Sequence, residues 1–299
     1  DRLSLLKSLG EELRRHRLGP KVPPDVLDLP PRSVRAVLAP HIDYQRGGPA
    51  YAWAYQAMRD HGTSPRTWFV LGTLHRPSSH RFIATRKNFE TALGLVETDH
   101  DALALLEKTY GHELYRDEFA HAGEHTIEIQ ALYLRHIFDD GATPMPKIVP
   151  ILVGSFHDLL TQEGSPRGVA EIGDFCDALR SVLDEMGDEA GLIGSVDLSH
   201  CGPHFGHECL NDPERVREIE AADRAMLDAL ESGDPDRFFD TFRPDLNARN
   251  VCSIAAIYCV MDVMRDRARP RVLTYQHHNS EDLACLVSFT SVAFVKQQA

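Results

Sequence analysis

Three apolar runs of this chain end on a histidine, at His41, His75 and His200, and each run has the length of a β-strand. Short uninterrupted apolar runs are typical of buried strands in a parallel sheet whose two faces are covered by helices. In open α/β sheets, binding sites lie just beyond the carboxyl ends of such strands. We therefore expect the three histidines to converge in a metal site or an acid/base site.

The rest of the chain alternates between strand patterns and helix patterns. This alternation predicts an α/β fold with a largely parallel or mixed central sheet covered by helices on both faces. Strands are expected at 34–39, 68–72, 81–85, 147–153, 191–197, 271–276 and 284–295. Helices are expected at 49–61, 99–109, 124–138, 167–186, 213–231 and 250–265, with Pro49 in a first turn, Thr98 as an N-cap and a shorter helix opened by Asp234-Pro235. We expect one domain over residues 32–299, preceded at 1–31 by an amphipathic helix (3–16) and a Pro-rich connector.

The composition argues against two classes of partner. A net charge of −13, with no run of Lys and Arg, disfavours binding to nucleic-acid phosphates. No apolar stretch reaches the roughly 18 residues that a membrane span needs. The first nine residues are too charged for a signal peptide, and six widely spaced cysteines are typical of reduced thiols. We expect a cytoplasmic protein that acts on a small molecule or a peptide, and the sequence leaves its oligomeric state open.

His41 and His75 each follow a predicted strand and precede a turn signal, Gly47-Gly48 in the first case and Pro77 in the second. Imidazole is the commonest metal ligand at neutral pH, and a strand end is rigid enough to hold one. Both histidines are therefore candidate metal ligands. The alternative, a histidine hydrogen-bonded to loop backbone, stays open at this point.

The third run brings Asp197 and His200 within three residues of each other. A carboxylate beside an imidazole can fix its tautomer, and the imidazole can then serve as a general acid or base, or as a ligand. The alternative is that Asp197 caps a turn and His200 is merely exposed.

Residues 121–125 match H-x-x-E-H, a zinc-peptidase signature in which two histidines bind zinc and the glutamate is the base. Gly123 favours a turn, so we expect the helix to start near Glu124 and to leave His121 off it. A zinc peptidase built on His121, Glu124 and His125 is the weaker interpretation. Glu124 and His125 can still face a catalytic site.

Two further segments contain cysteines. Residues 201–209 hold two cysteines and two histidines, but their spacing matches no standard structural zinc site, so a ligand-facing loop is expected there. Cys252 is expected at the start of a helix, where a thiol has a lowered pKa and binds metals as the thiolate. The alternative for Cys252 is a small buried apolar residue, as we expect for Cys259.

In their order and spacing these motifs resemble the Memo-like family, also called the AmmeMemoRadiSam system protein B family, over residues 34–296. The segments that carry the resemblance are Ala39-Pro-His41-Ile-Asp-Tyr44, Leu71-Gly-Thr-Leu-His75, Thr91-Ala-Leu-Gly94, His121 with Glu124-His-Thr-Ile-Glu-Ile-Gln130, Val149-Pro-Ile-Leu-Val-Gly154, Ser195-Val-Asp-Leu-Ser-His200 and Cys252-Ser253.

The resemblance implies an α/β fold related to the class III extradiol dioxygenases. It also implies a redox metal, iron (Fe²⁺) before copper, bound by His41, His75 and Cys252, with Asp197 and His200 beside it. The chain departs from the family pattern at Ile42-Asp43 (Ala-Gly in the family), Thr73-Leu74 (Pro-Ser), Arg76 (His) and Ser253 (Gly). These changes surround the candidate ligands without replacing them, so they bear on the substrate and partner more than on the metal. Asp43 is a candidate additional carboxylate.

Three functions are compatible with these patterns. The first is a dioxygenase-like, metal-dependent oxidoreductase in which His200, oriented by Asp197, moves protons and Glu124 and His125 face the same site. A thiolate ligand favours a soft or borderline metal for it. The second is a non-catalytic module that binds a ligand or peptide, or senses redox state, on a dioxygenase-like fold. The third is the zinc peptidase.

Overall fold

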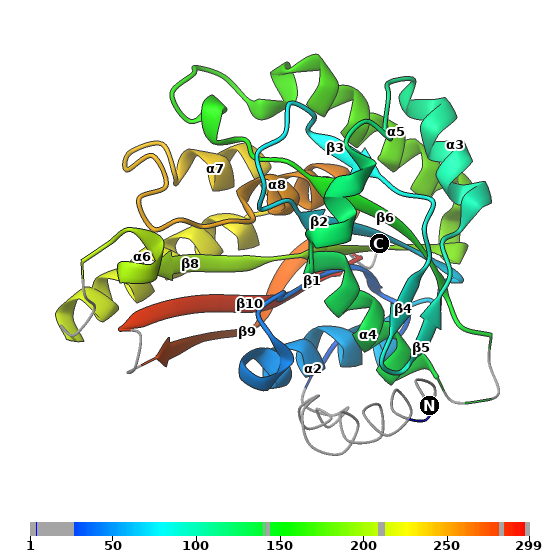
Figure 1. Ribbon diagram of the computed structural model, residues 1–299, viewed down its shortest axis with the longest axis horizontal. Helices are drawn as coiled ribbons and strands as arrows, with labels where there is room; N and C mark the ends of the chain where they lie inside the picture. Colours follow the sequence, from blue (N-terminus) through cyan, green and yellow to red (C-terminus); the bar gives the residue numbers. More distant parts are fainter. Residues whose placement is uncertain are drawn as a thin grey trace.

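The computed structural model describes residues 4, 27–139, 141, 144–208, 213–280 and 284–296, which form a single α/β domain (Figure 1). The strands are β1 (Val34–Ala39), β2 (Thr67–Thr73), β3 (Phe82–Ala84), β4 (Phe89–Thr91), β5 (Gly94–Val96), β6 (Lys147–Val153), β7 (Ala190–Ser195), β8 (Asp197–Cys201), β9 (Arg269–Ser280) and β10 (Cys285–Val295). The α-helices are α2 (Tyr44–His61), α3 (His100–Tyr110), α4 (Thr126–Phe138), α5 (Ala170–Met186), α6 (Pro213–Glu231), α7 (Pro235–Asp240) and α8 (Ile254–Met264).

The central sheet is mixed, in the order β3-β6-β2-β7-β1-β10-β8, with β9 paired to β10. Its middle is parallel, because β6, β2, β7 and β1 run in one direction. Strand β10 runs antiparallel to β1, β8 and β9, and β3 runs antiparallel to β6. The predicted α/β fold with a parallel or mixed sheet is confirmed.

Helices cover both faces of this sheet (Figure 1). Helices α2 and α4 pack on one face, while α3, α5, α7 and α8 pack on the other. Strand β1 shows why: Ala36 and Leu38 belong to one core and Val37 and Ala39 to the other, since successive side chains of a strand point to opposite faces. No helix among these residues is long and apolar enough to cross a membrane.

Five helix starts differ from the prediction, by one to five residues, and the largest difference is at α2. Helix α2 begins at Tyr44 instead of residue 49, because Asp43 caps it by accepting hydrogen bonds from the backbone N–H groups of Gln45 and Arg46. Gly47 and Gly48 therefore lie inside the helix and not in a turn, and a Cβ at Gly47 would come within 2.5 Å of Ile42 Cγ2. Helix α3 is capped by Asp99, not by Thr98.

The predicted strand 191–197 is in fact divided. Strand β7, in the middle of the sheet, ends at Ser195, and the chain continues after Val196 as β8, which pairs with β10 and lies at one end of the sheet order. His200 consequently lies within β8 and not at the carboxyl end of a parallel strand. The predicted helix over 3–16 lies outside the described residues, apart from residue 4.

Candidate metal centre

His41 and His75 meet at the carboxyl ends of two parallel strands that are separated by a third. His41 follows β1 and His75 follows β2, and the sheet places β7 between these two strands. Their ring centroids are 5.1 Å apart, with the ring planes at 87°. Ser195, the last residue of β7, lies between them and supplies hydrogen-bond acceptors to both strand ends.

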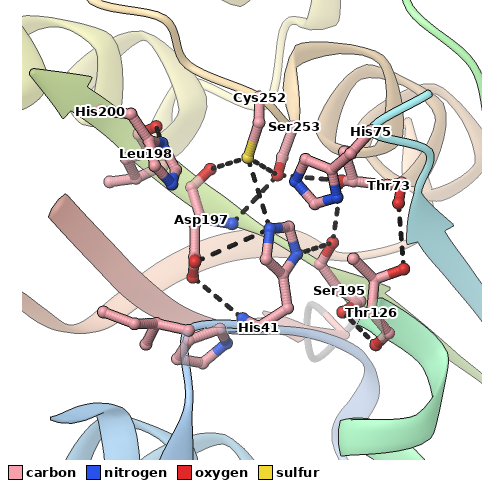
Figure 2. A network of polar contacts seen from close by, with 12 residues as sticks. His41, Thr73, His75, Thr126, Ser195, Asp197, Leu198, His200, Cys252 and Ser253 are labelled. Carbon is pink, nitrogen blue, oxygen red and sulfur yellow. Dashed lines mark hydrogen bonds and ion pairs between the residues drawn. The ribbon is translucent and has the colours of Figure 1, made fainter. Parts of the chain in front are cut away.

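The buried His41 side chain is held in one tautomer. Its Nδ1 lies 3.1 Å from the carbonyl oxygen of Ser195, and because a carbonyl only accepts, Nδ1 carries the proton (Figure 2). The unprotonated Nε2 faces Cys252 Sγ at 3.4 Å and Asp197 Oδ2 at 3.7 Å. Burial lowers the pKa of His41 well below its usual range. The ring is therefore neutral, which is the form that binds metal ions.

Glu124 holds the His75 and His125 side chains. Its carboxylate accepts from Nδ1 of His75 and Nδ1 of His125, each at 3.1 Å, and from both backbone N–H groups at 2.9 Å. Burial alone would raise the pKa of Glu124, but the hydrogen bonds from His125 and His75 outweigh it and lower that pKa. The ionised carboxylate thus orients two imidazoles and leaves their Nε2 atoms available, as carboxylates do behind metal-bound histidines.

The start of α4 is fixed against the same strand ends. Thr126 Oγ1 donates to the carbonyl of Thr73 at 3.0 Å, and Ser195 Oγ donates to the carbonyl of Thr126 at 2.7 Å. Gln130 Nε2 donates to Ser195 Oγ at 2.8 Å. Gly72 permits this close approach, since a Cβ there would lie 2.7 Å from Thr126 Oγ1. These contacts place Glu124 and His125 over the end of β2.

Cys252 lies in the turn that precedes α8, opposite His41. One ligand atom each from His41, His75 and Cys252 fall within 4.8 Å of one another, which makes these three a candidate metal site. Burial, and then the nearby Asp197 carboxylate, raise the pKa of the Cys252 thiol to about 12. The prediction of a lowered pKa is therefore wrong for the protein alone. A thiolate here needs a cation beside it, which a metal ion would provide.

Ser253 joins the turn of Cys252 to β2 and β8. Its Oγ accepts from the backbone N–H of Asp197 at 3.0 Å and lies at hydrogen-bond distance, 3.0 Å, from Thr73 Oγ1. Thr73 and Ser253 are two of the departures from the family pattern, and the structure shows that they contact each other. No local pattern predicts this contact, because 180 residues separate Thr73 from Ser253.

Asp197 and His200 lie beside the candidate ligands in different ways. The buried Asp197 accepts the backbone N–H of His41 at 2.9 Å, and burial raises its pKa. His200 is half-buried on the far side of Asp197, and its Nδ1 donates to the carbonyl of Leu198 at 3.0 Å (Figure 2). The Leu198 carbonyl, not Asp197, therefore orients the His200 ring. Burial lowers the pKa of His200.

Two other candidate residues lie outside this cluster. His121, in a short 3₁₀-helix (η2, Glu118–Gly123), directs Nε2 to the carbonyl of Ile83 at 2.9 Å. Among the described residues, the groups that could hold a metal ion are His41 with His75 and Cys252, and His75 with Glu124 and His125, and His121 belongs to neither. The H-x-x-E-H pattern thus does not assemble a zinc site. Asp43 caps α2 and pairs with Arg46, so it adds no carboxylate here.

The loop after β8 shows no metal cluster in its described part, 201–208. His207 directs Nε2 to the carbonyl of Ala248 at 2.8 Å, and Cys201 is buried with its sulfur 3.8 Å from the carbonyl of Arg249. Cys209 lies outside the described residues.

Comparison with known proteins agrees with the family resemblance of the sequence motifs. A family model for Memo-like proteins matches residues 4–294. A MEMO1 family protein of Methanopyrus kandleri is 31% identical over 229 residues, which cover 76% of this chain and 74% of the relative. MEMO1 family proteins of Pyrobaculum aerophilum and Caldivirga maquilingensis are 31% and 28% identical, and each match covers 94% of this chain and 90% of the relative. Among solved structures, an uncharacterized protein of Escherichia coli K12 matches 87% of this chain and 99% of its own, with 12% identity and a TM-score of 0.43. On the family model and the sequence relatives, this chain belongs to the Memo-like family.

Proposed function

We propose that this Memo-like protein binds a redox-active metal ion, iron before copper, through His41, His75 and Cys252 and uses it in oxidation–reduction chemistry on a small molecule. The observation that carries the proposal is the convergence of two imidazoles and one thiol, with ligand atoms within 4.8 Å, from three separate segments of the chain. Each imidazole has a hydrogen-bond partner at Nδ1, Ser195 for His41 and Glu124 for His75.

The donor set suits a metal of borderline softness. Imidazole and thiolate ligands bind iron, copper and zinc in preference to Mg²⁺ or Ca²⁺. Three protein ligands leave coordination positions open for a substrate, as catalytic sites require. When bound, iron supplies one-electron redox chemistry and a position for dioxygen or substrate.

His125 is the residue best placed to move a proton at this centre. Its side chain is 54% exposed, and its ring centroid lies 5.3 Å from that of His75 and 5.6 Å from that of His41. The hydrogen bond to Glu124 raises the pKa of His125. The imidazole therefore keeps its proton to higher pH than an ordinary histidine, as a general acid requires. Asp197 and His200 line the opposite side of the centre.

The first test is the metal content of purified protein, measured by elemental analysis after reconstitution with Fe²⁺ or Cu²⁺ under anaerobic conditions. His41→Ala and Cys252→Ala should each lower the affinity for the metal by more than about 100-fold, because losing a ligand exceeds the 10- to 100-fold cost of losing an outer partner. His121→Ala is the matched control and should retain metal. The proposal fails if the first two variants bind as much metal as the wild type.

A second measurement separates an enzyme from a binding module. Oxygen consumption by the iron-loaded protein, with the metal-free protein as control, should depend on both metal and an added organic reductant or substrate. Metal binding without any turnover would favour the redox-sensing alternative.

We also propose that the protein acts in the cytoplasm. Within the described part of the chain, Cys176, Cys201, Cys252 and Cys259 form no disulfide, which supports a reducing compartment. Cell fractionation with an antibody against the chain tests this.

A further inference from the structure

Arg76 lies at the rim of the metal centre, directly after the candidate ligand His75. Its side chain is exposed, and its guanidinium rests against the backbone of Gly123. A Cβ at Gly123 would come within 2.8 Å of Arg76 Cζ, so the guanidinium lies directly against the glycine. Gly123 precedes Glu124, whose carboxylate holds His75 and His125.

The loop that carries Arg76 is tied to the segment beneath it. Ser78 Oγ donates to Asp117 Oδ2 at 2.8 Å, which connects the loop to the residue before η2. Ser78 Oγ also accepts the backbone N–H of His80 at 3.0 Å. Pro77 fixes φ at the intervening position. The guanidinium is therefore presented from a tethered loop.

The carboxylates near Arg76 already have other donors. Glu124 accepts four N–H groups from His75 and His125, and Glu118 accepts Thr85 Oγ1 at 2.7 Å and the backbone N–H of Arg86. Within the part of the chain that the structure describes, no carboxylate lies at ion-pair distance from Arg76, whereas Arg86, ten residues on, pairs with Glu107 at 2.9 Å. Although the chain has a net charge of −13, the five N–H donors of the Arg76 guanidinium therefore face solvent beside the metal centre.

We propose that Arg76 binds the carboxylate of a small organic substrate whose other end reaches the metal centre. A guanidinium matches a carboxylate with two parallel hydrogen bonds, which fixes orientation as well as charge. The body of the ligand would meet apolar surface on η2, where Phe119 is 92% exposed. The inference rests on the proposed metal centre for the far end of the substrate, but the carboxylate contact itself requires no metal.

The test compares two probes with the same hydroxyphenyl ring, 3-hydroxybenzoate, which carries an anionic carboxylate, and 3-hydroxybenzyl alcohol, which carries a neutral hydroxymethyl group. Their dissociation constants are measured by ligand-observed NMR with wild type, Arg76→Gln and Arg66→Gln. Arg66 is the matched control, because it removes the same charge just before β2, at the end of the strand opposite His75. Wild type and Arg66→Gln should prefer the carboxylate by roughly 10- to 100-fold, the range for a charge-assisted bidentate contact.

Arg76→Gln should lose this preference and leave the binding of the alcohol unchanged, while Arg76→Lys should retain part of it. Thermal unfolding should be the same for wild type and the Arg76 variants, since Arg76 makes no ion pair with a described residue. The proposal is overturned if wild type binds both probes equally, if the carboxylate does not bind at millimolar concentration, or if Arg76→Gln keeps the preference.

Running the same titrations on metal-free and metal-loaded protein separates the two proposals. If the protein takes up no metal but still prefers the carboxylate through Arg76, the proposed metal centre is wrong and the Arg76 site is supported. If the protein takes up metal but shows no preference for the carboxylate, the metal centre is supported and the Arg76 site is wrong.

Discussion

The metal centre has a buried half and an exposed half, and they are held in different ways. In the buried half, hydrogen bonds join His41, Asp197 and Ser253 to one another and to backbone groups. Each of these three residues is at most 2% exposed, whereas the neighbouring Cys252 is half-buried. In the exposed half, a single carboxylate, Glu124, holds His75 and His125 at the solvent boundary. Buried polar groups without partners are costly, whereas exposed ones can turn to water. The buried half therefore couples ligand geometry to folding, and the exposed half is free to handle protons and substrate.

The largest expected effect is that of Asp197→Ala in the buried half. The backbone N–H of His41 loses its acceptor, so the free energy of unfolding should fall by about 1–3 kcal/mol. Metal affinity should fall with it, because the backbone that carries His41 is no longer fixed. Chemical denaturation and elemental analysis measure the two quantities.

Asp197→Asn is the informative companion, since it keeps a carbonyl acceptor for the His41 N–H and removes the charge. It should retain most of the stability. Asp188→Asn, at an exposed site, is the control. If Asp197→Ala is as stable as wild type, folding and ligand geometry are not coupled through this contact.

Glu124→Gln addresses the exposed half. An amide cannot accept from four N–H groups, so metal affinity should fall by roughly 10- to 100-fold, as for other outer partners of metal-bound histidines. Unfolding free energy should change less than in Asp197→Ala, because His75 and His125 can bond to water. Titration calorimetry with the metal and denaturation of the metal-free protein provide the comparison.

The same variant changes the pH dependence of the metal-free protein. The pKa of His125 is raised above 6.5 in the folded state, chiefly by its hydrogen bond to Glu124. The corresponding stability is present below pH 6.5 and is lost as pH rises through the folded pKa. In Glu124→Gln, the pKa of His125 should fall and this loss should disappear. NMR titration of the His125 ring measures this pKa in wild type and in Glu124→Gln. The same pKa in both proteins would contradict the hydrogen bond between His125 and Glu124.

The two halves also differ in how far the sequence predicted them. The meeting of His41 and His75 follows from strand periodicity and the rule for sheet edges, and those features are local. The division of 191–197 into β7 and β8 does not follow, because pairing with β10 decides it, and β10 lies almost 90 residues away along the chain. Cys252 was implied by the family resemblance alone. Glu124 was placed near the site, but its hold on His75 depends on Gly72 letting α4 approach β2.

A smaller effect is expected at the contact between Thr73 and Ser253, which joins the two halves. Thr73→Val and Ser253→Ala should each lower the free energy of unfolding by about 1 kcal/mol. Because the two hydroxyls contact each other at 3.0 Å, the double variant should cost less than the sum of the single variants. A double-mutant cycle by urea denaturation measures the coupling, and strict additivity would show that the hydroxyls act independently.

The smallest effect on the centre is expected for Asp43→Ala, although Asp43 is only two residues from His41. Its carboxylate is 42% exposed and is used by the N–H groups of Gln45 and Arg46 at the start of α2. Losing an N-cap costs about 1 kcal/mol of stability, so urea denaturation should detect the change. Metal content should equal that of the wild type, because the side chain contacts neither half of the centre. Asp43→Asn, which retains an acceptor for the cap, should restore stability. If Asp43→Ala instead lowers metal content while Asp43→Asn does not, then the start of α2 belongs with the buried half, and its cap helps to position His41.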